Sequence, residues 1–131
     1  MNRVIRFRGK RKYSKEWVYG DLHTLCGHIH IHVTPCDKYN IDRATVGQFT
    51  GLKDKNGEEI YEGDIVVLRR RTKNLGDIQT IEWCSHLAAF TRVTDGDDAH
   101  LISAADMALY EVIGNIHDNP ELLKSRHAKE T

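Results

Sequence analysis

The sequence has no long hydrophobic run. None of its apolar stretches approaches the ~20 residues that a helix needs to cross a bilayer. The basic start around Arg3, Arg6 and Arg8 leads into no uninterrupted apolar region of the kind found in a signal peptide. We therefore expect a cytoplasmic protein without a membrane partner.

Cysteine is scarce as well. The three cysteines, Cys26, Cys36 and Cys84, cannot all pair within one chain, and no C-x-x-C spacing occurs. A disulfide framework needs an even set of cysteines and a zinc ribbon needs paired thiol ligands, so the sequence favours neither. It predicts ordinary thiols in a reducing compartment.

An excess of charge of either sign is absent. Lysine plus arginine and aspartate plus glutamate number 19 each, so the formal net charge is zero. No global field favours nucleic acid, anionic lipid or acidic substrates. Any binding driven by charge must therefore come from local clusters.

Common catalytic signatures are also missing. The sequence contains no G-x-S-x-G, no G-x-x-x-x-G-K-[ST] and no H-E-x-x-H, which are typical of hydrolases, phosphate-binding loops and metalloproteases. The side chains close enough in sequence for acid–base or nucleophilic work are Glu58, Glu59, Glu62, Asp64, Cys84 and His86. Such chemistry also needs a cleft and an oriented base, and no pattern indicates either. We name no catalytic residue and favour a non-enzymatic protein.

Closely spaced glycines are the clearest positive feature. Between residues 44 and 68, Gly47, Gly51, Gly57 and Gly63 separate short β-prone segments. Glycine in such a setting marks turns, bulges or close backbone approaches. A chain of 131 residues is the size of one ordinary domain. The sequence therefore predicts a single, mainly β domain.

Alternating and continuous apolar patterns predict the individual elements. We expect strands at Val4–Arg8, Trp17–Leu25, His28–Val33, Ile65–Leu68, Ile78–Trp83, Leu87–Val93, His100–Ser103 and Tyr110–His117. The all-apolar run Ile65–Leu68 indicates a strand buried on both faces. A helical turn capped by Ser103 and a short C-terminal helix from Asn119 are the helical elements expected.

Two further segments are interpreted from their turn-forming residues. Thr34–Arg43, with its proline, aspartates and asparagine, is expected to be a surface loop. Asn56-Gly57 is the strongest hairpin signal, because a type I′ turn needs two residues with positive φ. That turn would place Lys55 opposite Glu58.

With these segments in view, the chain resembles the YopX family of phage and prophage proteins. The residues that carry the resemblance are Trp17-Val18-Tyr19-Gly20-Asp21-Leu22, Thr45-Val46-Gly47-Gln48-Phe49-Thr50-Gly51-Leu52-Lys53-Asp54, Asn56-Gly57, Ile60-Tyr61-Glu62-Gly63-Asp64-Ile65-Val66, Tyr110-Glu111-Val112-Ile113-Gly114-Asn115-Ile116 and Asn119-Pro120-Glu121-Leu122-Leu123. They follow one another in the expected order and span the chain nearly from end to end.

The resemblance implies a small SH3-like β-barrel with additional hairpins, encoded by a bacteriophage or an integrated element. It also implies a homo-oligomer in the cytoplasm of the bacterial host, and it implies no reaction. We expect one YopX-like domain over residues 1–131. The alternative is two small β subdomains, an N-terminal part and residues 44–123.

Histidines gather on one face of a predicted hairpin. Cys26-Gly27 would join the strands before and after it, so that His23 lies opposite His30 and Asp21 opposite His32. The imidazoles of His30 and His32, with His23 across the ladder, can bind zinc, and Asp21 supplies a carboxylate. A metal-binding protein or a metal-dependent enzyme is therefore one alternative function. The alternative, which we favour, is that these residues form the wet face of an amphipathic hairpin and that the protein has no cofactor.

Two basic clusters suggest a nucleic-acid partner. They consist of Arg8, Lys10, Arg11 and Lys12, with Tyr13 beside them, and of Arg69, Arg70, Arg71 and Lys73. Cationic side chains neutralise phosphates and release counterions, which gives affinity without sequence preference. The alternative is that they are solvated strand ends that discourage edge-to-edge aggregation.

A third class of function is a module for protein contacts. Small β-rich chains have exposed strand edges, and pairing them with a second copy hides them, so a homo-oligomer is expected. Trp17, Tyr19, Trp83 and Phe90 are candidate interface anchors, although core packing is favoured for Trp83 and for at least one of Trp17 and Tyr19. Our leading hypothesis is an oligomeric, non-enzymatic accessory protein whose protein partner the sequence does not name.

Overall fold

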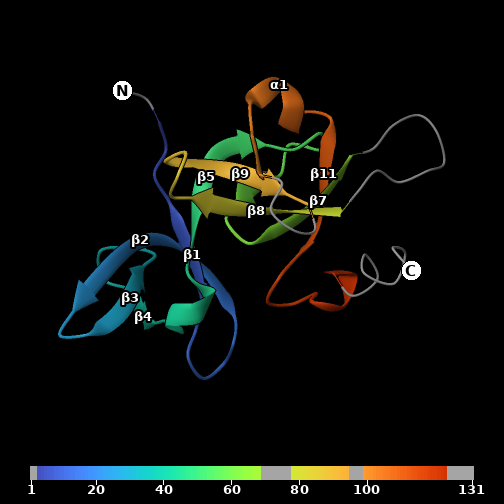
Figure 1. The fold of residues 1–131 in the computed structure, drawn as a ribbon. Helices are drawn as coiled ribbons and strands as arrows, with labels where there is room; N and C mark the ends of the chain where they lie inside the picture. Colours follow the sequence, from blue (N-terminus) through green and yellow to red (C-terminus); the bar gives the residue numbers. More distant parts are fainter. Residues whose placement is uncertain (1–2, 69–77, 95–98, 124–131) are drawn as a thin grey trace. The chain divides into compact units, whose positions relative to one another are not determined.

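The computed structural model describes residues 3–68, 78–94 and 99–123, which form antiparallel strands joined by short turns (Figure 1). The strands are β1 (Phe7–Lys10), β2 (Trp17–Leu25), β3 (His28–His32), β4 (Lys38–Asn40), β5 (Gly47–Lys53), β6 (Glu59–Tyr61), β7 (Asp64–Leu68), β8 (Ile78–Cys84), β9 (Ala89–Val93), β10 (Ala99–Leu101) and β11 (Tyr110–Asn115). A 3-10 turn, η1, covers Arg43–Thr45, and the helix α1 covers Ala104–Met107. The prediction of a mainly β protein is confirmed.

The strands belong to two sheets, and the chain divides into two compact units. The first sheet has the order β4-β3-β2-β1-β5-β6 and the second has the order β10-β9-β8-β7-β11. Unit 1 is Met1–Gly51 and unit 2 is Leu52–Thr131. Each unit is described by itself below.

In unit 1 the long hairpin of β2 and β3 has the register that the sequence predicts. His23 lies opposite His30 and Asp21 lies opposite His32. On the other side of β3, β4 runs antiparallel with Ile31 opposite Tyr39. β2, β3 and β4 can be followed side by side in Figure 1. Because neighbouring side chains alternate between faces, Ile31 is fully buried on one face of β3, while His30 and His32 lie on the other face and are half-buried.

Two glycines make room for the small core of unit 1. A Cβ atom on Gly9 would overlap the side chain of Ile41 and press on Ile31, and a Cβ atom on Gly20 would overlap the backbone carbonyl of His32. Ile31 and Ile41 are 0% and 5% exposed. Strand backbones and isoleucine side chains therefore fill a space that larger residues at positions 9 and 20 would occupy.

Neither sheet closes into a barrel in the part of the chain that the structure describes. An isolated bridge joins Arg11 to Ile41, beyond the ends of β1 and β4, but no continuous strand pairing extends it. The physical reason is that β4 is three residues long and the chain enters the 3-10 turn η1 at Arg43, so the pairing around this bridge does not extend into a continuous ladder. The SH3-like barrel is therefore not confirmed.

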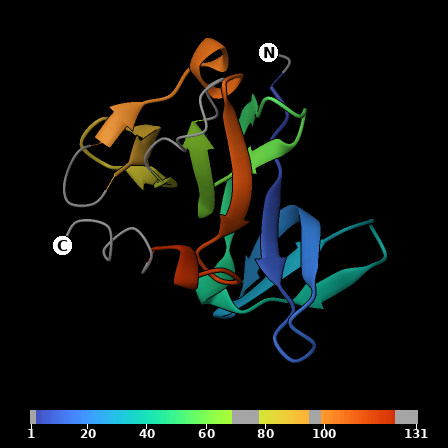
Figure 2. The same cartoon turned by 90° about the vertical axis from the view of Figure 1, so that its right-hand side faces the viewer.

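Unit 2 has a core to which the second sheet, β6 and α1 all contribute. The buried cluster consists of Ile60, Val66, Ile81, Met107 and Tyr110. β7 runs beside β11 in the middle of this unit (Figure 2), with Val66 opposite Val112. Ile65, Val66 and Val67 are all 0% exposed, which confirms the prediction of a strand buried on both faces.

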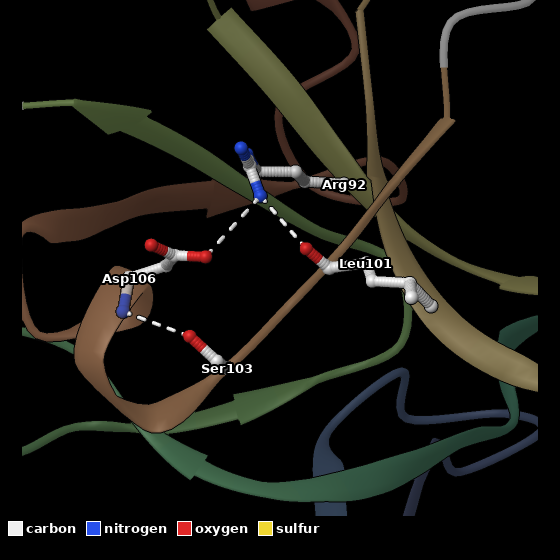
Figure 3. A network of polar contacts seen from close by, with 4 residues as sticks. All are labelled: Arg92, Leu101, Ser103 and Asp106. Carbon is white, nitrogen blue, oxygen red and sulfur yellow. Dashed lines mark hydrogen bonds and ion pairs between the residues drawn. The ribbon is translucent and has the colours of Figure 1, made fainter.

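Arg92 ties the edge of the second sheet to α1 (Figure 3). Its Nη1 donates to the Leu101 carbonyl at 2.9 Å and lies 3.9 Å from an oxygen of Asp106. Its guanidinium carbon is 5.5 Å from the centre of the Tyr110 ring. Ser103 caps α1 by accepting a hydrogen bond from the Asp106 N–H, as the sequence predicts.

Asp54 organises the turn between β5 and β6 and attaches it to β11. Its Oδ1 accepts from the N–H groups of Asn56 and Glu58 at 2.8 and 2.9 Å, and its Oδ2 accepts from the N–H of Val112 at 3.0 Å. The side chain is 5% exposed. A buried carboxylate with three backbone donors fixes both the turn and the strand that crosses it.

This turn differs from the predicted one by one residue. The Asp54 N–H, and not that of Lys55, pairs with the Glu58 carbonyl. Gly57 has φ +81°, whereas Asn56 is not among the described residues with positive φ, so the turn is not of type I′. The Asp54 side chain binds the Asn56 N–H and so outweighs the local preference of Asn-Gly.

The segment Thr34–Arg43 is not simply a surface loop, because it contains β4 and leads into η1. The C-terminal helix begins near Glu121, and its continuation lies outside the described residues. Asn119 does not cap it as expected, because its Oδ1 accepts from the Asn115 N–H. The described part of β1 starts three residues later than predicted, at Phe7.

We expect Asp54→Ala to lower the free energy of unfolding by about 2–4 kcal/mol, because three backbone N–H groups in part-buried hydrogen bonds lose a charged acceptor. Urea denaturation followed by circular dichroism measures the change. Glu58→Ala is the matched control, since the Glu58 side chain is exposed in the same turn. Equal stability of the two variants would contradict the role given to Asp54.

Candidate functional site

The two units carry opposite charge. Residues 1–51 contain nine lysines and arginines against four aspartates and glutamates, whereas residues 52–131 contain ten against fifteen. The zero net charge of the whole chain hides this difference. Interactions between exposed charges are screened beyond ~10 Å, so a ligand near unit 1 responds to the local excess of positive charge.

The turn between β1 and β2 places cations at one end of unit 1. The Arg11 N–H donates to the Glu16 carbonyl at 2.8 Å, and the Lys15 N–H donates to the Arg11 carbonyl at 3.0 Å. Lys15 has φ 62°, which allows this tight return. The turn therefore presents Lys12 and Tyr13 at its tip, and the Tyr13 side chain is 84% exposed.

The segment from Asn40 to Thr45 is hydrogen-bonded to the end of β1. The Lys12 N–H donates to the Asn40 carbonyl at 3.0 Å, and the Asp42 N–H donates to the Lys10 carbonyl at 2.9 Å. The Thr45 hydroxyl accepts from the Lys10 N–H at 2.8 Å and donates to the Asp42 carbonyl. These bonds bring β4 and η1 against the basic turn.

Two hollows result, one on each side of Lys12 and Tyr13. The first, of about 360 Å³, also borders Arg11, Lys38 and Tyr39. The second, of about 540 Å³, also borders His28, Ile29 and Arg43. Both volumes fall within the ~300–1,000 Å³ range of ligand pockets. Of the side chains that border the hollows in the described residues, Asp42 alone is acidic, and its Oδ1 accepts from the Ala44 N–H.

Aromatic rings accompany the cations. The Arg11 guanidinium carbon lies 4.5 Å from the centre of the Tyr39 ring, a cation–π contact. The Arg11 Nη1 also lies 3.6 Å from an oxygen of Glu16. The residues that border one or both hollows and carry either positive charge or a tyrosine ring are Arg11, Lys12, Tyr13, Lys38, Tyr39 and Arg43. We refer to these six as the basic-aromatic surface.

The predicted basic residues do not all reach this surface. Arg11 and Lys12 belong to it, whereas Arg8 is 6% exposed and its guanidinium lies 4.7 Å from the centre of the Trp17 ring. The Lys10 Nζ lies 5.5 Å from the same ring. The second cluster, Arg69, Arg70, Arg71 and Lys73, lies outside the described residues.

Sequence reasoning missed Lys38, Tyr39 and Arg43. They fall in the segment interpreted as a loop, and their only local signal is the short alternation around Tyr39 in the run Lys38–Ile41. Arg43 is held in place by a hydrogen bond from its Nη2 to the Gly27 carbonyl at 3.2 Å.

The histidine face lies on the outer side of the β2–β3 hairpin. His23 and His32 contact each other edge to face, with ring centres 5.5 Å apart. Within residues 3–68, 78–94 and 99–123, no group of three or more histidines, cysteines or carboxylates is placed to hold a metal ion. Zinc binding by His23, His30, His32 and Asp21 stays a prediction.

Unit 2 carries an exposed apolar group at the tip of the β8–β9 hairpin. Trp83 lies opposite Phe90, with ring centres 5.2 Å apart in a T-shaped arrangement. Trp83 and Leu87 are 52% and 50% exposed. The expectation that Trp83 packs in the core is therefore wrong: Ile81 takes the core position on the same strand face, and Trp83 lies beyond the core.

In the chain's described residues no helix is long and apolar enough to span a membrane.

A protein family and a solved structure are similar to this chain. No curated protein matches the sequence. A crystal structure of protein EF1440 from Enterococcus faecalis is similar, with a TM-score of 0.62 and 27% sequence identity over 93% of this chain and 99% of that chain. The family described as YopX protein matches residues 6–124. The chain belongs to the YopX family.

Proposed function

We propose that this protein is a non-enzymatic accessory protein of a phage or prophage and that its basic-aromatic surface binds nucleic acid inside the bacterial host. The observation that carries the proposal is the pair of adjacent hollows bordered by four cations and two tyrosines. Lysines and arginines on such a surface neutralise phosphates, and tyrosines offer faces to bases.

The alternative role of cations at a strand edge explains only part of this surface. Lys38 begins the edge strand β4, where a lysine discourages pairing with another chain. That role does not account for Tyr13, whose large ring is 84% exposed between two hollows. An exposed tyrosine beside cations is typical of a surface that contacts a partner.

We expect the double substitution Lys12→Gln and Lys38→Gln to weaken binding of a labelled oligonucleotide about tenfold or more at ~50 mM salt. The salt dependence of binding should also fall, by roughly 1.4 in the slope of log K against log salt for a single strand, because two phosphate contacts are lost. Fluorescence anisotropy over a salt series measures both quantities.

The matched control removes the same charge from unit 2. Lys53 and Lys55 are exposed, so the double substitution Lys53→Gln and Lys55→Gln tests charge without touching the basic-aromatic surface. The control should bind as the unchanged protein does. The absence of salt-dependent binding, or equal losses in both double variants, would overturn the proposal.

A second proposal concerns self-association. We propose that copies of this chain assemble through the tip of the β8–β9 hairpin, where Trp83, Leu87 and Phe90 lie. Tryptophan and other aromatic residues contribute much of the binding energy in protein interfaces. The exposed Trp83–Phe90 pair supports this role, because it continues the core-facing side of β8 beyond the core.

We expect Leu87→Ser to raise the dissociation constant of the oligomer about tenfold, because a buried leucine contact contributes ~1–2 kcal/mol. Light scattering coupled to size exclusion, over a dilution series, measures the change. Leu109→Ser is the control, since Leu109 is 58% exposed away from the hairpin tip. A monomer at all concentrations, or the same response from both variants, would refute this interface.

A further inference from the structure

The shape of the basic-aromatic surface points to one class of nucleic acid. Resting on the function proposed above, we infer that the surface binds single-stranded nucleic acid, with bases stacked on Tyr13 and on the Arg11–Tyr39 pair and with phosphates beside Lys38, Lys12 and Arg43. The inference names both the strand state of the ligand and the side chains that distinguish it.

Concavity is the first argument. Proteins that read a duplex insert a protruding helix or β-ribbon into a groove. In the described residues of unit 1 the helical structure is the 3-10 turn η1, and the long β2–β3 ribbon carries none of the six residues of the basic-aromatic surface. The cations of that surface border hollows of about 360 and 540 Å³. A hollow admits an unpaired base, whereas a duplex keeps its base faces stacked inside.

The tyrosines supply the second argument. Tyr13 borders both hollows and is 84% exposed, so its ring is available to a planar ligand. Tyr39 borders the first hollow and already holds the planar Arg11 guanidinium at 4.5 Å from its ring centre. Bases stack on aromatic rings and on guanidinium planes alike, and every base has such a face.

The order of the cations supplies the third argument. Lys38 borders the first hollow, Lys12 borders both, and Arg43 borders the second. One of the Arg43 nitrogens is held by the Gly27 carbonyl, which fixes the position of the side chain. Cations therefore follow the hollows in sequence, as the phosphates of a strand with bases in adjacent hollows would require.

The test compares three ligands of equal length, in which the bases are unpaired, paired or absent. A labelled single strand of about 12 nucleotides, a duplex of the same sequence, and a base-free deoxyribose-phosphate strand are titrated at low salt by fluorescence anisotropy. We expect the normal single strand to bind about tenfold or more tighter than the base-free strand, because only the first gains stacking.

Tyr13 provides the matched variants. Tyr13→Ala should weaken binding of the normal single strand roughly tenfold and leave binding of the base-free strand unchanged, whereas Tyr13→Phe should keep the stacking face and the affinity. An exposed residue at a turn tip leaves the core intact, and thermal unfolding checks that all variants are folded.

The outcomes separate the two proposals. If no ligand binds at low salt, both the nucleic-acid function and this inference are overturned. If the duplex and the base-free strand bind as tightly as the normal single strand and Tyr13→Ala has no effect, the inference is overturned while charge-driven binding stands. A preference for the normal strand that Tyr13→Ala removes and Tyr13→Phe retains supports the inference.

Discussion

The basic-aromatic surface depends on the hydrogen bonds that join the end of β1 to residues 40–45. Lys12 bonds Asn40, Asp42 bonds Lys10, and the Thr45 hydroxyl accepts from the Lys10 N–H and donates to Asp42. Lys12–Tyr13 and Lys38–Arg43 come from separate parts of the sequence, so backbone bonds and not local order bring them together. Ile41, which lies within the hydrogen-bonded segment, packs over Gly9, where a Cβ atom would overlap its side chain.

Much of the local structure could be predicted because it follows from alternation within a few residues. The β2–β3 register and the buried strand β7 are cases in which side-chain period and turn residues agree. β4 could not be predicted in this way, since three residues carry too little pattern and their conformation is set by contacts with β3. The β5–β6 turn was predicted with the wrong register because the Asp54 side chain binds the Asn56 N–H within the turn, while its other oxygen binds the Val112 N–H, 58 residues away.

The zero net charge of the whole chain was misleading, because the charges are distributed unevenly between the two compact units. The zero total favours no polyanion, yet the excess of nine cations over four carboxylates in residues 1–51 lies within one compact unit. The alternative of two subdomains divided near residue 44 was the one reason in the sequence to count charge in two parts, and the boundary after Gly51 is a property of the fold. Screening over ~10 Å makes the local count the relevant one for a ligand.

Arg11 and the two lysines contribute different properties to the basic-aromatic surface. Its guanidinium lies near Glu16, whose side chain is 71% exposed, and over the Tyr39 ring. An exposed ion pair contributes at most ~1 kcal/mol, so Glu16 offsets the charge of Arg11 without preventing a phosphate from replacing it. Stacking on Tyr39 meanwhile keeps the guanidinium plane oriented. Lys12 and Lys38 have no carboxylate partner among the ion pairs of the described residues, so they supply net charge while Arg11 supplies a planar face.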